Sequence, residues 1–471
     1  MAKKTKTLKG AKNTLYYGDN LHVMQRYLAD ASVDLIYLDP PFKSDKNYNV
    51  LFKKKSDEDV ANDDAQILAF TDTWSWGPDD KESYELLISK AEPQIATVVN
   101  ALYRILGPSD MMSYIVMMAP RLIEMKRILK PTGSIYLHCD MSASHYLKVL
   151  MDAVFGVENF LNNVVWLYGL GGSSRRYWPR KHDDLLWYSR SPDKHFFEAD
   201  KIPATSQRLK GKLKKAPDYW DIPAINNMAK ERMGYPTQKP LELLERVVRS
   251  SCPENGVVLD PFCGCGTAVV AAQSLGRSWI GIDVSFLAVE LMRERIDTVF
   301  SGVAVYDVNG IPTDEVSAFA LHERDPFEFE RWAVSAVDGH PNDRQVGDRG
   351  EDGRIRYWHD HEELREMTVS VKGGRTVNPG MIRDLRGTME RLGRDMGLLI
   401  TNQDPTPGMR EEAASAGQYT HPISNRKYPR IQIITAKEIL KGERPDMPTV
   451  ESPYRRAATV DSQLEMEFDE S

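Results

Sequence analysis

The sequence has 471 residues, more than one hydrophobic core usually holds, so two or three domains are expected. Hydrophobic residues make up 41% and charged residues 27%, which is typical of a soluble globular protein, and no apolar run is long enough to cross a bilayer. The net charge of -7 excludes a uniformly basic surface, but it leaves room for a local basic face that binds nucleic acid.

The ends and the cysteines indicate where the protein works. The basic start, Met1 to Lys9, has no apolar segment behind it, so it is not expected to be a signal peptide. Four cysteines are too few for a disulfide scaffold and favour a reducing compartment. We therefore expect a cytoplasmic protein that is not associated with a membrane.

The first part of the chain alternates short β-type runs with one long helical pattern. Apolar residues three and four apart predict a helix from Tyr114 to Leu129, and the stretch Lys130–Gly133 is predicted to end it. Strands are predicted at residues 13–17, 33–38, 134–139 and 185–189.

A second run of elements begins near Pro240 in the order helix, strand, helix, strand. A strand, helix and strand in succession form a βαβ unit, which implies a parallel sheet. The chain up to about Phe300 is therefore predicted to be one doubly wound α/β domain. Its elements here are a helix over 241–251, a strand over 256–259, a helix over 267–275 and a strand over 278–282.

A second, smaller α/β domain is predicted after this point. Asp325 before Pro326 is a helix start, with an acid at the cap and proline in the first turn. Strands are predicted over 367–371, 397–401 and 431–434. The segment from Asp461 to Ser471 has five acids and little apolar content, which predicts a disordered tail.

The segment Val257–Thr267, with the sequence VVLDPFCGCGT, predicts a glycine turn after a buried strand. Glycines there let the backbone approach a ligand closely at the start of a helix. Asp283 lies 17 residues after Gly266, where an acid can accept hydrogen bonds from both ribose hydroxyls of an adenosine. A tight turn without a ligand is the alternative. Cys263 and Cys265 have no second cysteine pair, so a zinc site is not expected.

The tetrapeptide Asp39-Pro40-Pro41-Phe42 follows the predicted strand at 33–38. The two prolines make a stiff loop with free carbonyl acceptors but no amide donors. Asp39 and the Pro40 carbonyl can each accept one hydrogen of an amino group, and Phe42 can stack on a flat ring. A strand-ending turn with a buried phenylalanine is the alternative.

Taken together, the two motifs resemble the β-group of the amino-methyltransferases of DNA. In that group the Asp-Pro-Pro-aromatic motif precedes the glycine motif, as it does here. Tyr17–Leu21 and Thr237–Pro240 look like further signatures, and the resemblance covers about residues 12–300. It implies that S-adenosylmethionine is the methyl donor and that the base is flipped out of the DNA. Aspartate before Pro-Pro resembles the adenine-modifying members, with cytosine-N4 methylation as the alternative.

The resemblance also implies roles for individual residues. Asp39, Pro40, Pro41 and Phe42 would form the catalytic loop. No cysteine lies beside Asp39, which agrees with amino rather than ring-carbon methylation. The residues that would bind the cofactor are Asp19, Thr237, Asp260, Phe262, Gly264, Gly266, Thr267 and Asp283.

Target recognition would lie at about residues 170–233, where basic and aromatic residues alternate. Such stretches suit phosphate contacts and base stacking, with a solvated surface as the alternative. Double-stranded DNA is the expected partner. The residues expected to contact it are Arg175, Arg176, Trp178 and Lys181, and a second basic cluster comprises Arg208, Lys210, Lys212, Lys214 and Lys215.

Residues 318–440 resemble the Mrr-type restriction-endonuclease-like fold, followed by a tail over 441–471. Asp352 and Lys372 match the acid and lysine of its metal site, where Mg²⁺ would bind. Ser370 stands where the family has an acid or Gln, which weakens the metal site. Asp348 and Glu330 are possible substitutes.

Several functions stay open beside adenine methylation. A bifunctional enzyme would also cut DNA with the second domain, whereas a degenerate nuclease fold would serve only DNA binding or assembly. An RNA target requires the same chemistry. A non-catalytic DNA-binding protein is disfavoured by the two intact motifs. A homodimer and a separate restriction subunit are further open partners.

Overall fold

The computed structural model describes residues 13–41, 47–51, 66–71, 76–169, 175–204, 208, 211–226, 229, 231–233, 235, 237–342, 350–360 and 363–448. These residues form two compact units, between which the chain passes at Asn309 and Gly310. We call the N-terminal one the methylase unit and the C-terminal one the nuclease-like unit, after the two resemblances above.

A nine-stranded sheet is the centre of the methylase unit. Its order is β10-β6-β7-β5-β2-β11-β12-β1-β13, and only β7 among these strands runs against its neighbours, so the sheet is mostly parallel as predicted. The strands are β1 (Thr14–Tyr17), β2 (Val33–Leu38), β5 (Leu129–Cys139), β6 (Phe160–Leu167), β7 (His182–Ser189), β10 (Tyr219–Asp221), β11 (Val257–Asp260), β12 (Ser278–Asp283) and β13 (Asp307–Asn309).

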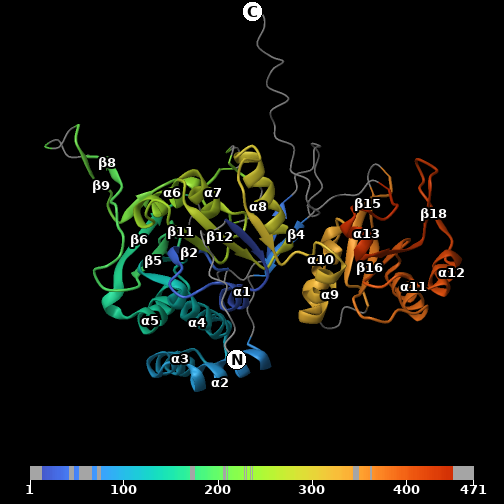
Figure 1. Ribbon diagram of the computed structural model, residues 1–471, viewed down its shortest axis with the longest axis horizontal. Helices are drawn as coiled ribbons and strands as arrows, with labels where there is room; N and C mark the ends of the chain where they lie inside the picture. The colour runs from blue at the N-terminus through green and yellow to red at the C-terminus, as the bar shows by residue number, and fades with distance from the viewer. Residues whose placement is uncertain are drawn as a thin grey trace, which may run out of the picture. The chain divides into compact units, whose positions relative to one another are not determined.

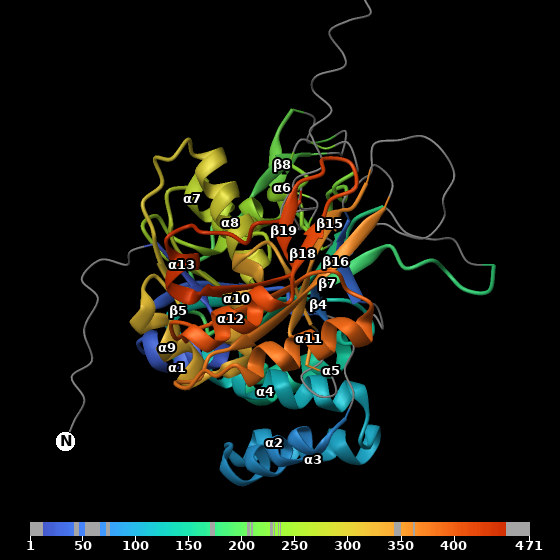
Figure 2. The same cartoon turned by 90° about the vertical axis from the view of Figure 1, so that its right-hand side faces the viewer.

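Helices cover both faces of this sheet, as a doubly wound fold requires (Figure 1). The helices are α1 (Asn20–Tyr27), α2 (Pro78–Lys90), α3 (Pro93–Leu106), α4 (Asp110–Ile128), α5 (Ser144–Phe155), α6 (Leu241–Ser251), α7 (Thr267–Ser274) and α8 (Phe286–Val299), with a 3-10 turn at Val157–Asn159. Helices α1, α4 and α5 pack on one face, and α6 and α7 pack on the other. Helices α2 and α3 lie side by side against α4 (Figure 2).

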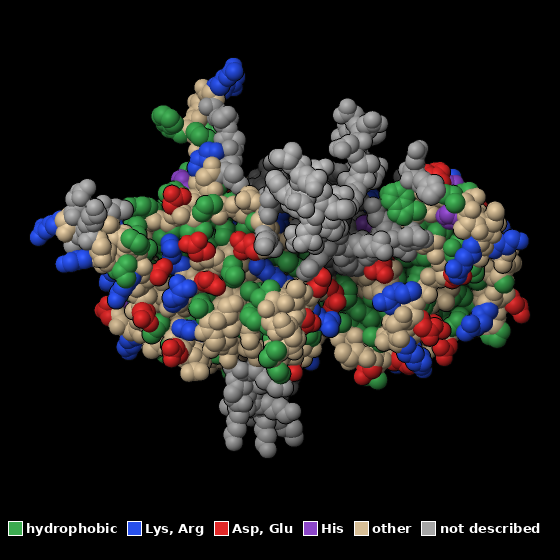
Figure 3. Space-filling model, turned by 90° about the horizontal axis from the view of Figure 1, so that it is seen from above, with side chains coloured by type: hydrophobic (Ala, Val, Ile, Leu, Met, Phe, Trp, Pro, Cys, Tyr) green, Lys and Arg blue, Asp and Glu red, His purple; other side chains and the backbone are tan. Residues whose placement is uncertain are grey.

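The chain before Asn309 also forms two two-stranded hairpins. Strand β3 (Asn47–Leu51) pairs with β4 (Gln66–Thr71), and β8 (Lys201–Pro203) pairs with β9 (Leu213–Lys215). Lys and Arg side chains project at the end of the β8–β9 hairpin, at the left of Figure 3. Elsewhere on this face acidic and basic side chains are interspersed, which agrees with the modest net charge.

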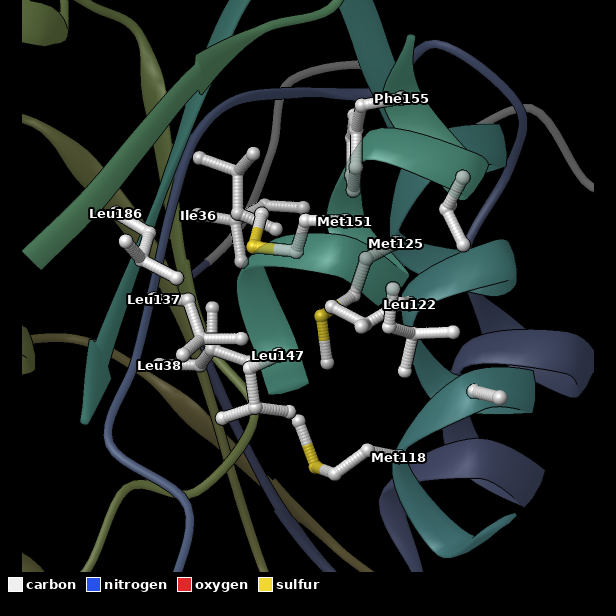
Figure 4. Close-up of a cluster of buried hydrophobic side chains, with 14 of the residues drawn as sticks. Ile36, Leu38, Met118, Leu122, Met125, Leu137, Leu147, Met151, Phe155 and Leu186 are labelled. Atoms are coloured by element: carbon white, nitrogen blue, oxygen red, sulfur yellow. The ribbon is translucent and has the colours of Figure 1, made fainter. Parts of the chain in front are cut away.

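The core on the α4 and α5 face is built from aliphatic and methionine side chains that are fully buried or nearly so (Figure 4). Burying such a side chain contributes about 1.5–3 kcal/mol relative to leaving it exposed, so this layer stabilises the packing of the helices on the sheet. The labelled residues are Ile36, Leu38, Met118, Leu122, Met125, Leu137, Leu147, Met151, Phe155 and Leu186.

The nuclease-like unit has a five-stranded sheet in the order β14-β15-β16-β17-β20. Strands β16, β17 and β20 are parallel, whereas β14, β15 and β16 are joined antiparallel. Its elements are α9 (Glu315–Arg324), α10 (Pro326–Ala336), β14 (His340–Pro341), β15 (Gly353–Trp358), β16 (Leu364–Lys372), α11 (Gly380–Leu392), β17 (Gly397–Thr401), α12 (Pro407–Ser415), β18 (Gln418–Thr420), β19 (Lys427–Pro429), β20 (Ile431–Thr435) and α13 (Ala436–Leu440).

Most predicted elements agree with the structure within one to three residues, and the α/β class of both units is confirmed. The helix before Lys130–Gly133 does end there, at Ile128, but the next strand begins earlier than the predicted residue 134. Residues Lys130–Gly133 lie inside β5. Leu129 already pairs with Val33, and a bulge in the β2–β5 ladder absorbs the extra residues before Ser134 pairs with Leu35. Among the described residues, none of the helices has the length and apolar character needed to cross a membrane.

Candidate active site

The acids singled out in the sequence lie at one edge of the methylase sheet. Strands β1, β2, β11 and β12 are parallel, so their carboxyl ends meet at this edge. Asp39 follows β2, whereas Asp260 and Asp283 are the last residues of β11 and β12. The catalytic and cofactor motifs are therefore neighbours in space, although more than 200 residues separate them.

Asp39 forms an ion pair with Lys239, with 2.5 Å between Oδ2 and Nζ. Both side chains are largely buried, with exposed fractions of 16% and 12%. Pro40 is buried and Pro41 half-buried beside this pair, whereas Phe42 lies outside the described residues. The loop after β2 thus begins with a carboxylate that one ammonium group holds in place.

The glycine turn is tied to the end of β12. The backbone N–H of Gly264 donates to Oδ2 of Asp283 at 2.7 Å, and the N–H of Ser285 donates to Oδ1 at 2.8 Å. The N–H of Cys263 donates to the Ile282 carbonyl at 3.0 Å. Asp283 therefore fixes the turn, and its predicted contact with a ribose stays a prediction.

Two glycines in this turn occupy conformations that other residues rarely adopt. Gly264 has a φ of +52° and Gly266 a φ of +78°, both in the left-handed region. A Cβ on Gly266 would lie 2.5 Å from Cγ of Met292, and one on Gly264 would lie 3.1 Å from Tyr235. The glycines are thus needed for both backbone shape and close packing.

Asp260 is the most buried acid of the site, with an exposed fraction of 4%. It accepts a hydrogen bond from the N–H of Phe262 at 3.1 Å. Burial raises the pKa of Asp260 well above its usual value, and the nearby carboxylates of Asp39 and Asp283 raise it further, whereas Lys239 lowers it. All three acids and the lysine therefore share one electrostatic environment.

Asp19 has a structural role that was not predicted from the sequence. It caps the start of α1 by accepting from the N–H of His22 at 3.1 Å, and it pairs with Arg121 of α4. Asn20, beside it, donates to the carbonyl of Pro261 in the glycine turn at 2.7 Å. Asp19 thus supports the turn through its neighbours, and its contact with a cofactor stays a prediction.

Thr267, another predicted cofactor residue, begins α7 and is buried. Its hydroxyl accepts a hydrogen bond from Arg295 at 2.9 Å, and Arg295 also donates to the Cys265 carbonyl at 3.1 Å. Arg295 is itself only 3% exposed. Its guanidinium therefore links the last residues of the turn to α8. Phe262, near the start of the turn, is half-buried.

The segment before α6 carries Thr237 and Lys239 to the site. Gln238 locks this segment, because its side chain accepts from the N–H of Met233 at 2.7 Å and donates to the carbonyl of Glu231. The carbonyl of Thr237 lies 3.5 Å from the Lys239 ammonium. Thr237 is half-buried.

The sequence missed three groups at this edge. Lys239 stood in a quoted signature, but no spacing rule links it to Asp39. Tyr235 is buried against Gly264, and burial followed by the charge of Asp283 raises its pKa well above the usual value. The third group is a buried chain from β2 to β7, in which the Tyr37 hydroxyl lies 2.7 Å from His138 Nδ1 and His138 Nε2 lies 3.2 Å from Asp183.

The residues predicted to contact DNA lie in the loop between β6 and β7. This loop leaves the sheet at the edge that carries Asp39, because β6 runs parallel to β5 and β2. Arg175 and Arg176 are exposed, Lys181 is half-buried, and the indole of Trp178 is 93% exposed. The loop therefore presents cations and an aromatic ring beside the candidate site. Of the second cluster, Arg208, Lys212 and Lys214 are described, whereas Lys210 lies outside the described residues.

In the nuclease-like unit, Asp352 and Lys372 do meet, with 3.5 Å between Oδ2 and Nζ. Oδ2 of Asp352 also accepts from the Ser370 hydroxyl at 3.1 Å and from the N–H of Val371 at 2.6 Å. Asp348 lies outside the described residues, and Glu330 lies on α10.

No group of three metal-binding donors surrounds Asp352 in the part of the chain that the structure describes; such a group occurs there only at His359, Asp360 and Glu363. That group is already engaged, because His359 bonds to the Tyr419 hydroxyl and Glu363 to Arg365. At Asp352 a metal ion would therefore have to compete with three groups of the chain for Oδ2.

Comparison with known proteins agrees with this geometry. A family model described as DNA methylase, of the N6/N4 methyltransferase type, matches residues 33–294. A second model, NACHT-associated inactive restriction endonuclease 1, matches residues 327–441.

Individual relatives match the methylase unit. The type II methyltransferase M.HpaI of Haemophilus parainfluenzae is 36% identical over 184 residues, which cover 38% of this chain and 58% of that protein. The DNA adenine methyltransferase YhdJ of Escherichia coli is 23% identical over 300 residues, 60% of this chain and 82% of the relative. A solved DNA modification methylase from Thermus thermophilus is 19% identical, with a TM-score of 0.36, covering 63% of this chain and 99% of its own. The chain thus spans little more than half of M.HpaI.

Proposed function

The chain belongs to the N6/N4 DNA methylase family, and on that basis we propose that it transfers a methyl group from S-adenosylmethionine to the exocyclic amino group of adenine in double-stranded DNA. The observation that carries the proposal is the position of Asp39 beside the glycine turn, at one edge of one sheet. A carboxylate there can accept an amino hydrogen while the turn holds the methyl donor. No covalent enzyme intermediate is needed.

The turn fits an adenosine-containing cofactor. Gly264 and Gly266 keep the backbone open to a ligand, and the Asp283 carboxylate stands at the tip of the next strand. When bound, S-adenosylmethionine supplies a methyl group on a cationic sulfur. Asp260 and Phe262 would border it, Thr237 would lie near its amino-acid end, and Asp283 would accept from its ribose.

Adenine is favoured over cytosine by two observations. Aspartate precedes Pro-Pro at Asp39, as in the adenine-modifying members that the sequence resembles. One of the relatives that cover most of the methylase unit is named a DNA adenine methyltransferase. Cytosine-N4 methylation uses the same amino chemistry and is the alternative product.

The β6–β7 loop suits the DNA side of the reaction. An amino group inside a duplex cannot reach the Asp39 loop, so the base must leave the stack. Arg175, Arg176 and Lys181 would contact phosphates, and Trp178 would stack on a base.

We propose that the nuclease-like unit binds DNA but does not cut it. Ser370 replaces a metal-binding side chain, and Asp352 already has three partners on its own chain. The family model matching this unit describes an inactive restriction endonuclease. A bifunctional enzyme that requires Mg²⁺ is the alternative. No observation favours a homodimer or a separate restriction subunit, so neither is proposed.

Sequencing that detects modified bases tests the proposal, applied to DNA and RNA from cells that express the chain. Adenine methylation at one DNA sequence motif is the expected result, absent from cells that express Asp39→Ala. Methylcytosine in place of methyladenine would show that cytosine is the target base. Methylation confined to RNA would overturn the DNA assignment.

A further inference from the structure

We propose that Lys239 is a positioning residue of the methyl-transfer site, whose ammonium holds Oδ2 of Asp39 so that Oδ1 stays available for the amino group of the target base. The inference rests on the proposed function. It starts from the ion pair of 2.5 Å between the two side chains, which are 12% and 16% exposed. Among the described residues, Lys239 is the only hydrogen-bond partner of the Asp39 carboxylate.

The charges around Asp39 explain why a cation is needed there. Asp260 and Asp283 end the neighbouring strands, and Asp140 follows β5 at the same edge. Like charges at short range repel, which would push the Asp39 side chain away. The Lys239 ammonium offsets this repulsion at Oδ2 and leaves the carboxylate in one orientation.

Hydrogen bonds fix the backbone around Lys239, so the side chain that carries the ammonium extends from a defined position. Pro240 caps the start of α6, and the N–H of Leu241 donates to the Glu231 carboxylate at 3.1 Å. The Gln238 side chain binds the backbone of both Glu231 and Met233. Glu231 and Met233 end the region expected to recognise the target, so Lys239 joins that region to the catalytic carboxylate.

The position of the ammonium matters for the reaction at the nitrogen. As the nitrogen forms its bond to the methyl carbon and the bond from that carbon to sulfur breaks, positive charge moves to the nitrogen and one amino proton must leave. Oδ1 of Asp39 accepts the hydrogen bond from that amino group and then the proton, which passes on to water. A carboxylate that rotates freely would present Oδ1 in the required direction only part of the time, and misplacement by about 1 Å can cost about 100-fold in rate.

The test measures single-turnover methyl transfer by the full chain on duplex DNA, together with S-adenosylmethionine affinity by calorimetry. Lys239→Met should lower the rate by about 100-fold and leave the cofactor dissociation constant within about threefold. Lys239→Arg should retain part of the rate because it keeps the charge. Lys148→Met is the matched control, since Lys148 makes a half-buried ion pair with Asp152 in the same unit, on α5; its rate should stay close to wild type.

A chemical rescue separates positioning from folding. Alkylation of Lys239→Cys with 2-bromoethylamine restores an ammonium on a side chain of nearly lysine length. The four native cysteines are buried, and wild type treated with the same reagent measures any effect at them. Recovery of the rate upon alkylation supports the proposal.

A Lys239→Met rate within about threefold of wild type overturns the proposal while the proposed function stands. A reduced rate without rescue by either ammonium or guanidinium also overturns it, because the loss is then structural. A wild-type chain that methylates no DNA in the same assay overturns the proposed function and the inference together.

Discussion

Each of the two units joins one aspartate and one lysine at the carboxyl end of parallel strands. In the methylase unit Asp39 lies 2.5 Å from Lys239, and in the nuclease-like unit Asp352 lies 3.5 Å from Lys372. The aspartates are similarly buried, with exposed fractions of 16% and 8%, but Lys372 is 38% exposed against 12% for Lys239.

The two pairs differ in how many groups of the chain contact Oδ2 of the aspartate. Asp39 has one partner among the described residues, whereas Oδ2 of Asp352 has three: Ser370, Val371 and Lys372. Among the described residues neither carboxylate has a hydrogen-bond partner at Oδ1, so the two sites differ at Oδ2, where a metal ion at Asp352 must compete with three groups and a ligand at Asp39 with one. Matching residue types therefore do not by themselves show how strongly the chain already holds the carboxylate.

The largest effect that the comparison predicts comes from Asp39→Ala. We expect methyl transfer to fall below about one thousandth of wild type, because a positioned acid or base contributes about 10²–10⁴-fold. Cofactor affinity should stay nearly intact, since the turn is elsewhere in the chain. Asp352→Ala is the matched control and should methylate at the wild-type rate. Normal turnover by Asp39→Ala would end the mechanism.

Alanine substitutions at Gly266, in the turn, and at Gly276, outside it, separate backbone strain from overpacking. Gly266 and Gly276 both have positive φ, +78° and +68°, but a Cβ meets Met292 only at Gly266. Gly276→Ala should cost about 1–2 kcal/mol of unfolding free energy from backbone strain alone. Gly266→Ala should cost about 1–3 kcal/mol more from overpacking and should weaken cofactor binding. Denaturant titration of both variants measures the difference, and equal costs would mean that the turn relaxes.

Asp283→Ala should act on affinity rather than chemistry. Charge-assisted hydrogen bonds contribute about 1.5–3 kcal/mol each, so the dissociation constant of S-adenosylmethionine should rise at least about tenfold. Part of this loss comes from freeing the Gly264 amide, which Asp283 holds. Asp283→Asn keeps one acceptor and should lose less. If calorimetry finds the same constant for all three proteins, the ribose does not bind there.

The smallest effect is expected from Lys372→Ala. An ion pair with a lysine 38% exposed contributes about 0–1 kcal/mol, so unfolding should change little. Unmethylated plasmid incubated with Mg²⁺ or Mn²⁺ should remain uncut by both wild type and the variant. Efficient cutting by wild type that the variant loses would make this unit an active nuclease.

The sequence was a good guide where periodicity and turn chemistry decide the structure. The strand at 33–38 and the helix at 241–251 have the predicted bounds, because the strand is a short buried run and the helix, with one buried face, begins directly after Pro240. The bulge in β5 could not be foreseen, since it depends on the partner strand and not on Lys130–Gly133.

For the site, the sequence identified the acids but not what holds them. Asp39 and Asp283 were predicted from strand ends and Asp260 from the family resemblance, and parallel strands bring such ends together. Lys239 and Arg295 act through side chains that reach across the fold, and no local spacing encodes that reach. The same limit applied to Asp352, whose pairing with Lys372 was predicted while the hydrogen bonds that Ser370 and Val371 donate to its Oδ2 were not.

Nucleoside mass spectrometry tests the central claim most directly. The full chain is incubated with duplex DNA and S-adenosylmethionine carrying a labelled methyl group, beside Asp39→Ala, and the DNA is then digested to nucleosides. We predict labelled N6-methyladenine with wild type and none above background with Asp39→Ala. Label on cytosine, or equal label on adenine from both proteins, would contradict the account.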